Sequence, residues 1–156
     1  MSEFQDTLRA HTKLSGRSES EELEAIHTIC NLAKPYTLEG RSVLGRVQRV
    51  IDGDSMHISM PIDGHVWTFP CRMENIDCPE IRTRNLKEKE LGFLAKKHVE
   101  DLVKSDIISI KLGEFDKFGR LLATLHTSQE VNVGESLIEH NLARKYTGGK
   151  REPWGV

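Results

Sequence analysis

The stretch "SVLGRVQRVIDGDSMHISM", Ser42 to Met60, holds the pattern that decides the fold. Valine, isoleucine and methionine alternate with polar residues on both sides of Asp52-Gly53, which is typical of β-strands. Asp-Gly between two such runs is a strong signal for a tight turn, so the stretch predicts a β-hairpin. Asp54 stands where the second strand begins. Its carboxylate either completes the turn or holds a cation at that place.

The rest of the chain adds three more predicted strands and two predicted helices. The strands lie at 66–76, 107–112 and 120–126, and the helices begin after Asn85 and Asn132, both good helix caps. A helix placed after the third of five strands is the pattern of an OB-type barrel. We therefore predict an α+β fold, a five-stranded OB-fold β-barrel with packed helices.

The N-terminal part of the chain has a different character. Residues 1–17 are polar and lack a period, which indicates a loose arm. Residues 18–34 read as a short amphipathic helix that Ser18 can cap. We predict an N-terminal arm and helix over residues 1–40 and one domain over residues 41–156. The N-terminal segment is expected to bind its own barrel or a partner.

Composition limits the kind of protein that the chain can be. With 156 residues and a formal net charge of −2, it should form one core and carry no global basic field that attracts nucleic acid. No apolar run approaches the roughly 20 residues of a membrane span, and the N-terminus lacks the apolar core of a signal peptide. The three cysteines show no metal-like C-x-x-C spacing and read as reduced thiols. We predict an intracellular, cytoplasmic monomer without a membrane segment.

Two carboxylates mark one end of a predicted strand pair. Asp54 begins a strand and Asp77 ends the returning one, and antiparallel pairing brings such ends together. Carboxylates held close together repel each other unless a cation or a proton lies between them. Carboxylate oxygens are ligands that suit Ca²⁺ or Mg²⁺. Each aspartate alone also suits a turn or a cap, but the pair favours a metal site.

The segment "CRMENIDCPE", residues 71–80, brings two more charged groups toward this pair. Arg72 lies five residues before Asp77, and simple strand alternation would put the two on opposite faces. A bulge or a strong twist is therefore required to bring them together. Glu80 follows Pro79 in a loop, where its carboxylate can reach water. Alone, Arg72 also suits a surface ion pair, and Glu80 a solvated loop.

The segment "DKFGR", Asp116 to Arg120, reads in isolation as a plain turn. Its functional interpretation is that Arg120 delivers a second guanidinium at the start of a strand. Two arginines, a hard cation and a carboxylate together suit a phosphodiesterase. The cations neutralise the phosphate and stabilise the extra charge of the transition state, while the carboxylate orients or deprotonates a water molecule.

Three motifs, "VIDGDS", "RMENIDCPE" and "DKFGR", together resemble the staphylococcal nuclease (thermonuclease) family over about residues 43–147. The resemblance implies an OB-fold hydrolase, a Ca²⁺-dependent endonuclease that cuts DNA, RNA or both. It also implies that Asp54 and Asp77 bind Ca²⁺ through their carboxylates and Cys78 through its main-chain carbonyl. Mg²⁺ or Mn²⁺ could bind the same carboxylates.

The resemblance also implies roles for the other site residues. Arg72 and Arg120 would clamp the scissile phosphate, and Glu80 would position or activate the attacking water. Lys117 would approach a neighbouring phosphate. Tyr146 would stack on a base, although a tyrosine packed within the fold explains this residue equally well.

The sequence departs from the family at Phe118, among other places, and alternative functions stay open. Phe118 stands where the best-known members have tyrosine, so a hydroxyl group that could bind a phosphate is missing. The alternative function is a non-catalytic OB-fold module that binds nucleic acid or protein without cutting it. A third interpretation is a scaffold fragment of a multidomain protein. Loss of the arginines, the glutamate or the aspartates would favour these alternatives, and all of them are present.

Overall fold

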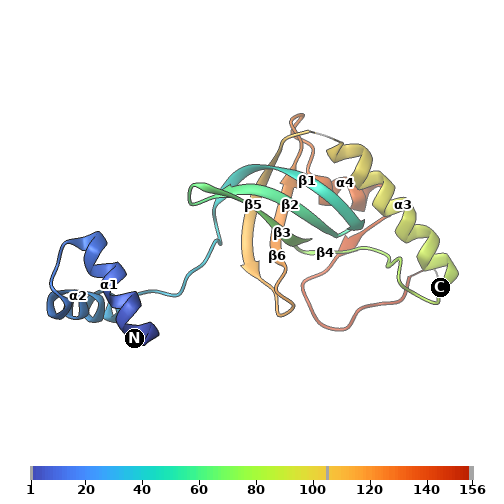
Figure 1. The fold of residues 1–156 in the computed structure, drawn as a ribbon. Helices are drawn as coiled ribbons and strands as arrows, with labels where there is room; N and C mark the ends of the chain where they lie inside the picture. The colour runs from blue at the N-terminus through green and yellow to red at the C-terminus, as the bar shows by residue number, and fades with distance from the viewer. Residues whose placement is uncertain (1, 105, 155–156) are drawn as a thin grey trace. The chain divides into compact units, whose positions relative to one another are not determined.

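A computed structural model describes residues 2–104 and 106–154 (Figure 1). Contacts within the chain divide it into two compact units, Met1–Thr37 and Leu38–Val156. The functional assignment of residues 1–40 and 41–156 as an extension and a catalytic domain stays a prediction. Among the helices of the described residues, none has the length and the apolar character needed to cross a membrane.

The smaller unit consists of two helices, α1 (Glu3–Ser15) and α2 (Glu19–Asn31). Ser2 and Ser18 cap them, each accepting a hydrogen bond from the backbone N–H of the residue three positions later. The helix predicted after Ser18 is therefore confirmed. The loose arm expected at the N-terminus is wrong, because a capped helix occupies most of it.

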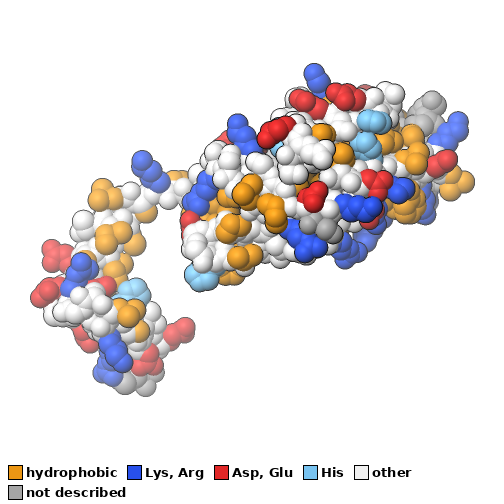
Figure 2. Space-filling model, turned by 90° about the horizontal axis from the view of Figure 1, so that it is seen from above, with side chains coloured by type: hydrophobic (Ala, Val, Ile, Leu, Met, Phe, Trp, Pro, Cys, Tyr) orange, Lys and Arg blue, Asp and Glu red, His pale blue; other side chains and the backbone are white. Residues whose placement is uncertain are grey.

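This pair of helices is held together by few buried groups. Leu8 is buried, and the buried Glu22 accepts a hydrogen bond of 2.6 Å from Ser15 between the helices. Glu22 also lies 3.5 Å from the guanidinium of Arg17. Large apolar side chains remain exposed on the unit, and Figure 2 shows hydrophobic groups on its surface. Binding of this segment to the barrel or to a partner stays a prediction.

The larger unit is built on a closed five-stranded barrel. Its strands are β1 (Ser42–Asp52), β2 (Ser55–Ile62), β3 (His65–Met73), β5 (Ile108–Phe115) and β6 (Leu121–His126). They follow one another around the barrel in the order β1-β2-β3-β6-β5, and only β3 and β6 pair in parallel. The predicted α+β fold with an OB-type barrel is confirmed.

Two helices and a small ladder complete this unit. The helix α3 (Leu86–Val103) contacts β1 and is capped by Asn85, and α4 (Val133–Glu139) is capped by Asn132 (Figure 1). The short strands β4 (Ile76–Asp77) and β7 (Arg144–Lys145) pair outside the barrel. The ladder carries Asp77 away from the barrel strands and toward the C-terminal segment.

The turn between β1 and β2 makes a close approach to α3 that requires glycine. A Cβ atom on Gly53 would lie 2.8 Å from the Cβ atom of Ala95 and 2.8 Å from the sulfur of Cys78. Any larger residue would push the turn away from the helix. The contact therefore fixes the position of Asp54, which follows directly in the chain.

The connection after β3 differs from the prediction. Strand β3 ends at Met73, and Asn75 adopts a left-handed conformation with φ of 61° before β4 begins. The long strand predicted for residues 66–76 is thus interrupted by a turn, which stands where the sequence predicted a bulge or a strong twist. The turn resets the faces on which Arg72 and Asp77 lie, which strand alternation alone could not do.

Candidate active site

A cavity of about 180 Å³ lies where the β1–β2 turn, the end of β3 and the C-terminal segment meet. Polar and charged groups dominate its lining: Asp52, Asp54, Ser55, Arg72, Asp77, Cys78, Glu80, Arg120, Tyr146 and Arg151. The structure thus brings together all the site residues predicted from the sequence except Lys117. The roles of these residues stay predictions.

Asp54 is a buried carboxylate at the base of the cavity. Its Oδ2 atom accepts a hydrogen bond of 3.1 Å from the backbone N–H of Cys78 and lies 3.6 Å from the guanidinium of Arg72. Burial and the neighbouring carboxylate of Asp52 raise the pKa of Asp54 to about 7, against the opposing effects of Arg72 and the Cys78 N–H. A further positive charge near Asp54 would therefore stabilise its ionised form.

Arg72 is held rigidly at the end of β3. Its guanidinium donates hydrogen bonds of 3.2 Å and 3.1 Å to the carbonyls of Met73 and Ile76. The guanidinium also lies 5.8 Å from the ring centre of Tyr146. The hydroxyl of Tyr146 donates to the carbonyl of Gly149 at 2.7 Å. Arg72 and Tyr146 therefore lie side by side in the cavity lining. Their roles in phosphate binding and base stacking stay predictions.

Arg120 is oriented by the turn that precedes β6. The carboxylate of Asp116 accepts hydrogen bonds from the backbone N–H groups of Phe118 and Arg120 and, at 2.8 Å, from Nε of Arg120. Burial tends to raise the pKa of Asp116, but these bonds outweigh it and lower the pKa. An Nη atom of Arg120 also donates to the hydroxyl of Ser55 at 3.4 Å. The turn therefore aims a guanidinium at the cavity.

Two neighbours of Arg120, Lys117 and Phe118, are exposed and do not line the cavity. Lys117 is exposed, does not line the cavity, and lies 5.2 Å from the ring centre of Phe118. Phe118 is 72% exposed, and its ring centre lies 5.5 Å from the guanidinium carbon of Arg120. The predicted contact of Lys117 with a neighbouring phosphate stays a prediction.

Glu80 is the most solvent-accessible carboxylate that takes part in an ion pair at the cavity. Its side chain is 52% exposed, and the nearest cation is Arg151, whose Nη1 lies 3.8 Å away. Its backbone N–H donates to the carboxylate of Glu88 at 3.3 Å, which fixes the loop after Pro79. The carboxylate of Glu80 can therefore accept a proton from water without breaking a short bond.

Arg151, which the sequence did not single out, ties the cavity to the C-terminal segment. Its guanidinium donates to Oδ1 of Asp77 at 2.9 Å, to the carbonyl of Cys78 at 3.0 Å and to the carboxylate of Glu88 at 2.6 Å. Burial tends to lower the pKa of Arg151, but the bonds to Asp77 and Glu88 outweigh it and raise the pKa. This cation therefore contacts two of the three groups predicted to bind Ca²⁺.

The second oxygen of Asp77 is also engaged. It accepts hydrogen bonds of 3.1 Å from Arg144 and 3.0 Å from the indole N–H of Trp154. Arg144 stands directly opposite Asp77 in the β4–β7 ladder, and its guanidinium lies 4.3 Å from the ring centre of Trp154. The C-terminal segment thus neutralises Asp77 with two arginines.

The chemistry of the donors bears on whether a cation fits here. Within residues 2–104 and 106–154, no three side chains of His, Cys, Asp or Glu gather in a group that could hold a metal ion. The carboxylates of Asp54 and Asp77 and the carbonyl of Cys78 are nevertheless hard oxygen donors. A cation beside Asp54 would offset the burial and the Asp52 carboxylate that raise the pKa of Asp54. The donor set fits Ca²⁺ where Arg151 releases Asp77 and Cys78.

Comparisons with known proteins agree with the motifs. Residues 70–153 match the model of the family described as staphylococcal nuclease homologue.

Three curated proteins illustrate the similarity. Endonuclease YhcR of Bacillus subtilis is 33% identical over 112 residues, which cover 65% of this chain and 9% of that protein. An uncharacterized endonuclease of Escherichia coli O157:H7 is 26% identical over 109 residues, or 70% of this chain and 65% of that one. Endonuclease Htp3 of Saprolegnia parasitica is 24% identical over 133 residues, or 76% and 63%. The chain spans less than two thirds of the length of each of these relatives.

Proposed function

Because the chain belongs to the staphylococcal nuclease homologue family, we propose that it is a Ca²⁺-dependent endonuclease that hydrolyses phosphodiester bonds of DNA, RNA or both. The observation that carries the proposal is the convergence of Arg72, Glu80 and Arg120 on one cavity. The names of the related endonucleases support the same reaction class.

The two arginines would bind the scissile phosphate. Arg72 belongs to β3 and Arg120 to the turn before β6. Each is already fixed, Arg72 by backbone carbonyls and Arg120 by Asp116. A planar guanidinium can donate two parallel hydrogen bonds to phosphate oxygens. Donors fixed in advance stabilise the additional negative charge of a five-coordinate transition state at little reorganisation cost.

Glu80 would orient or deprotonate the attacking water. Its carboxylate faces solvent and is held by no short hydrogen bond among the described residues, so a water molecule can approach it. A carboxylate in this position accepts the proton that water loses as its oxygen attacks phosphorus. The positive groups around the phosphate and the base on the water side then act on the same step.

A cation would be held by Asp54, Asp77 and the carbonyl of Cys78. When bound, Ca²⁺ supplies positive charge against the phosphate oxygens, and Mg²⁺ or Mn²⁺ could use the same oxygen donors. The proposal requires that Arg151 give up its bonds to Asp77 and Cys78, because the same oxygen atoms cannot serve both cations fully.

Arg151→Gln is therefore expected to tighten Ca²⁺ binding by about tenfold, the size of one lost charge-assisted hydrogen bond in the competing state. Titration calorimetry of Ca²⁺ into both proteins measures the change. Arg84→Gln, which alters an exposed arginine outside the cavity lining, is the matched control. Weaker Ca²⁺ binding by Arg151→Gln would mean that Arg151 supports the site and does not compete for it.

The proposed function is tested by incubating single-stranded DNA, plasmid DNA and RNA with the purified chain. Each substrate is offered Ca²⁺, Mg²⁺, Mn²⁺ or a chelator. Divalent-dependent cutting supports the nuclease, and the products separate internal cutting from cutting at ends. Binding without cutting under every condition would favour the non-catalytic OB-fold module. The monomeric state and the cytoplasmic location stay predictions.

A further inference from the structure

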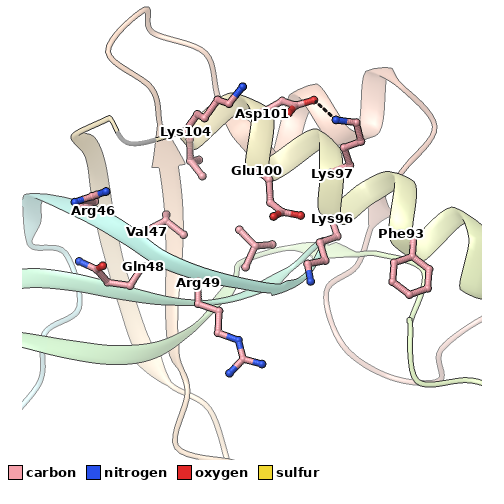
Figure 3. A pocket seen from close by; sticks show the side chains of 12 residues that line it. Arg46, Val47, Gln48, Arg49, Phe93, Lys96, Lys97, Glu100, Asp101 and Lys104 are labelled. Atoms are coloured by element: carbon pink, nitrogen blue, oxygen red, sulfur yellow. Dashed lines mark hydrogen bonds and ion pairs between the residues drawn. The ribbon is translucent and has the colours of Figure 1, made fainter.

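A second and larger cavity, a groove of about 990 Å³, lies between β1 and α3 (Figure 3). We call it the β1–α3 groove. The basic residues that line it are Arg46 and Arg49 of β1, Lys96 and Lys97 of α3, and Lys104 directly after α3. Glu100 and Asp101 are the acidic members. Positive charge is therefore concentrated here, in a chain whose formal net charge is −2.

A register shift in β1 puts its two arginines on the same face. Arg46 pairs with Ser59 of β2. After the shift at Gln48, Arg49 pairs with His57. Ser59 and His57 are two positions apart, so their partners share a face of the sheet. Both arginines are exposed on that face, and without the shift one of them would have pointed into the barrel.

The basic side chains of the groove are largely without partners. Lys97 pairs with Asp101 at 3.3 Å. Within the described part of the chain, no ion pair is formed by Arg46, Arg49, Lys96 or Lys104. Lys96 and Glu100 lie four residues apart on one side of α3, and Lys104 follows directly after the helix. Figure 3 shows Glu100 directed toward β1. Unpaired like charges repel each other, so a bound polyanion would stabilise them.

An aromatic ring stands at one end of the groove. Phe93 is half exposed and lies on α3 beyond Lys96, as Figure 3 shows. An exposed ring beside a row of cations is the combination that single-stranded nucleic acids use, because bases stack on the ring while phosphates follow the cations.

The end of the groove at Phe93 adjoins the candidate active site. Gly92 packs so closely on the loop after β4 that a Cβ atom on it would lie 3.0 Å from the carbonyl carbon of Glu80. On the other wall, Val50 lines the groove two residues before Asp52, which lines the active-site cavity. From Phe93 to Val103, α3 extends about 15 Å, which corresponds to about four stacked nucleotides.

We propose that the β1–α3 groove binds the phosphodiester backbone of a single nucleic-acid strand beside the active site, with a base stacked on Phe93. This inference rests on the proposed function for its link to cleavage, but binding can be measured alone. The phosphodiester backbone and the bases that stack are common to DNA and RNA, so strands of both kinds are tested.

Binding is measured by fluorescence anisotropy of labelled DNA and RNA strands of about 12 nucleotides, with a chelator present to prevent cutting. Lys96→Glu is expected to weaken binding about fivefold, and Glu100→Gln to strengthen it, because they change the groove charge in opposite directions. Lys111→Glu makes the same charge change on an exposed lysine of β5 and is the matched control. Equal affinities for Lys96→Glu and Lys111→Glu would overturn the proposal.

The salt dependence of binding, measured for Lys96→Glu and for Phe93→Ala, separates charge from stacking. Lys96→Glu is expected to make the dependence of binding on salt less steep, because a phosphate contact is lost. Phe93→Ala is expected to weaken binding about fivefold without changing that dependence, because stacking releases no counterions. A salt dependence that is the same in wild type and in Lys96→Glu would contradict the phosphate contact.

Kinetics distinguish failure of the groove from failure of the proposed function. For Lys96→Glu, the KM of the long strand is expected to rise about fivefold relative to the KM of a dinucleotide, which is too short to reach Lys96. Cleavage with an unchanged KM ratio would overturn the groove and leave the nuclease intact. Weaker strand binding by Lys96→Glu in a chain that cuts nothing would support the groove and overturn the nuclease.

Discussion

Glu80→Gln is expected to lower kcat for oligonucleotide cleavage by about 10²–10⁴-fold, the usual contribution of a general base. The amide has almost the same shape as the carboxylate but cannot accept a proton from water. The side chain is 52% exposed, so folding should change little. Initial rates at saturating substrate and Ca²⁺ measure the effect.

The control for this variant is Glu90→Gln, which changes an exposed glutamate of α3 outside the cavity lining. Calorimetry should find Ca²⁺ bound by Glu80→Gln, because Glu80 is not among the proposed donors. A kcat within a few-fold of wild type, about the spread between preparations, would remove Glu80 from the chemistry.

Arg120→Ala is expected to lower kcat by about 10²–10³-fold, the cost of removing one fixed donor to developing negative charge. Arg120→Lys should recover only part of this loss, because lysine keeps the charge but lacks the planar fork. Partial recovery would separate the charge of Arg120 from its geometry. Asp116 keeps two backbone N–H bonds in both variants, so the turn should persist.

Arg82→Ala, an exposed arginine that does not line the cavity, is the control for this series. Thermal melting of each variant tests whether the fold is retained. If Arg120→Ala lost affinity for substrate but kept its kcat, Arg120 would bind the ground state and the transition state equally well.

The barrel was predictable because its signals are local. The alternation from Ser42 to Met60 and the Asp52-Gly53 turn specify a hairpin without reference to the rest of the chain. Asn85 and Asn132 cap α3 and α4 as expected, since capping involves residues only two or three positions apart. The family resemblance seen in three short motifs is confirmed by the match over residues 70–153.

The first helix was missed because little of it is buried. The large apolar residues of α1 are Phe4, Leu8 and Leu14, and of these only Leu8 is buried. The stability of the helix comes from the Ser2 cap, the acidic first turn and the contact of Ser15 with Glu22 in α2. A serine cap followed by few apolar residues is a weak signal for a helix in a polar sequence.

The contacts of the C-terminal segment were missed for the opposite reason. Arg151 bonds to residues 63 to 74 positions earlier, and Trp154 bonds to Asp77. No periodicity or motif predicts contacts between residues so far apart in the sequence. The β4–β7 ladder, which brings the two segments together, is two residues long on each strand. Only the basic and aromatic residues after Gly148-Gly149 hinted that this segment could meet carboxylates.

The position of Arg72 relative to Asp77 could not be predicted by counting alternate residues along a strand, because a short turn separates them. Alternation places Arg72 and Asp77 on opposite faces, but the left-handed Asn75 ends β3 and starts a new register. Asparagine tolerates this conformation better than most residues, so the segment "MEN" carried a weak turn signal. Arg72 and Asp77 consequently line the same cavity, with a turn in place of the bulge or strong twist that strand counting required.

The most direct test of the account compares the Ca²⁺ dependence of oligonucleotide cleavage in wild type and in Asp54→Asn. Asparagine can still accept the bond from the Cys78 N–H but carries no charge toward a cation. We predict that wild type cuts only with a divalent cation and that Asp54→Asn needs about 10- to 100-fold more Ca²⁺ for half-maximal rate. The same half-maximal Ca²⁺ concentration in both proteins, or no cutting by folded wild type with Ca²⁺, Mg²⁺ or Mn²⁺, would contradict it.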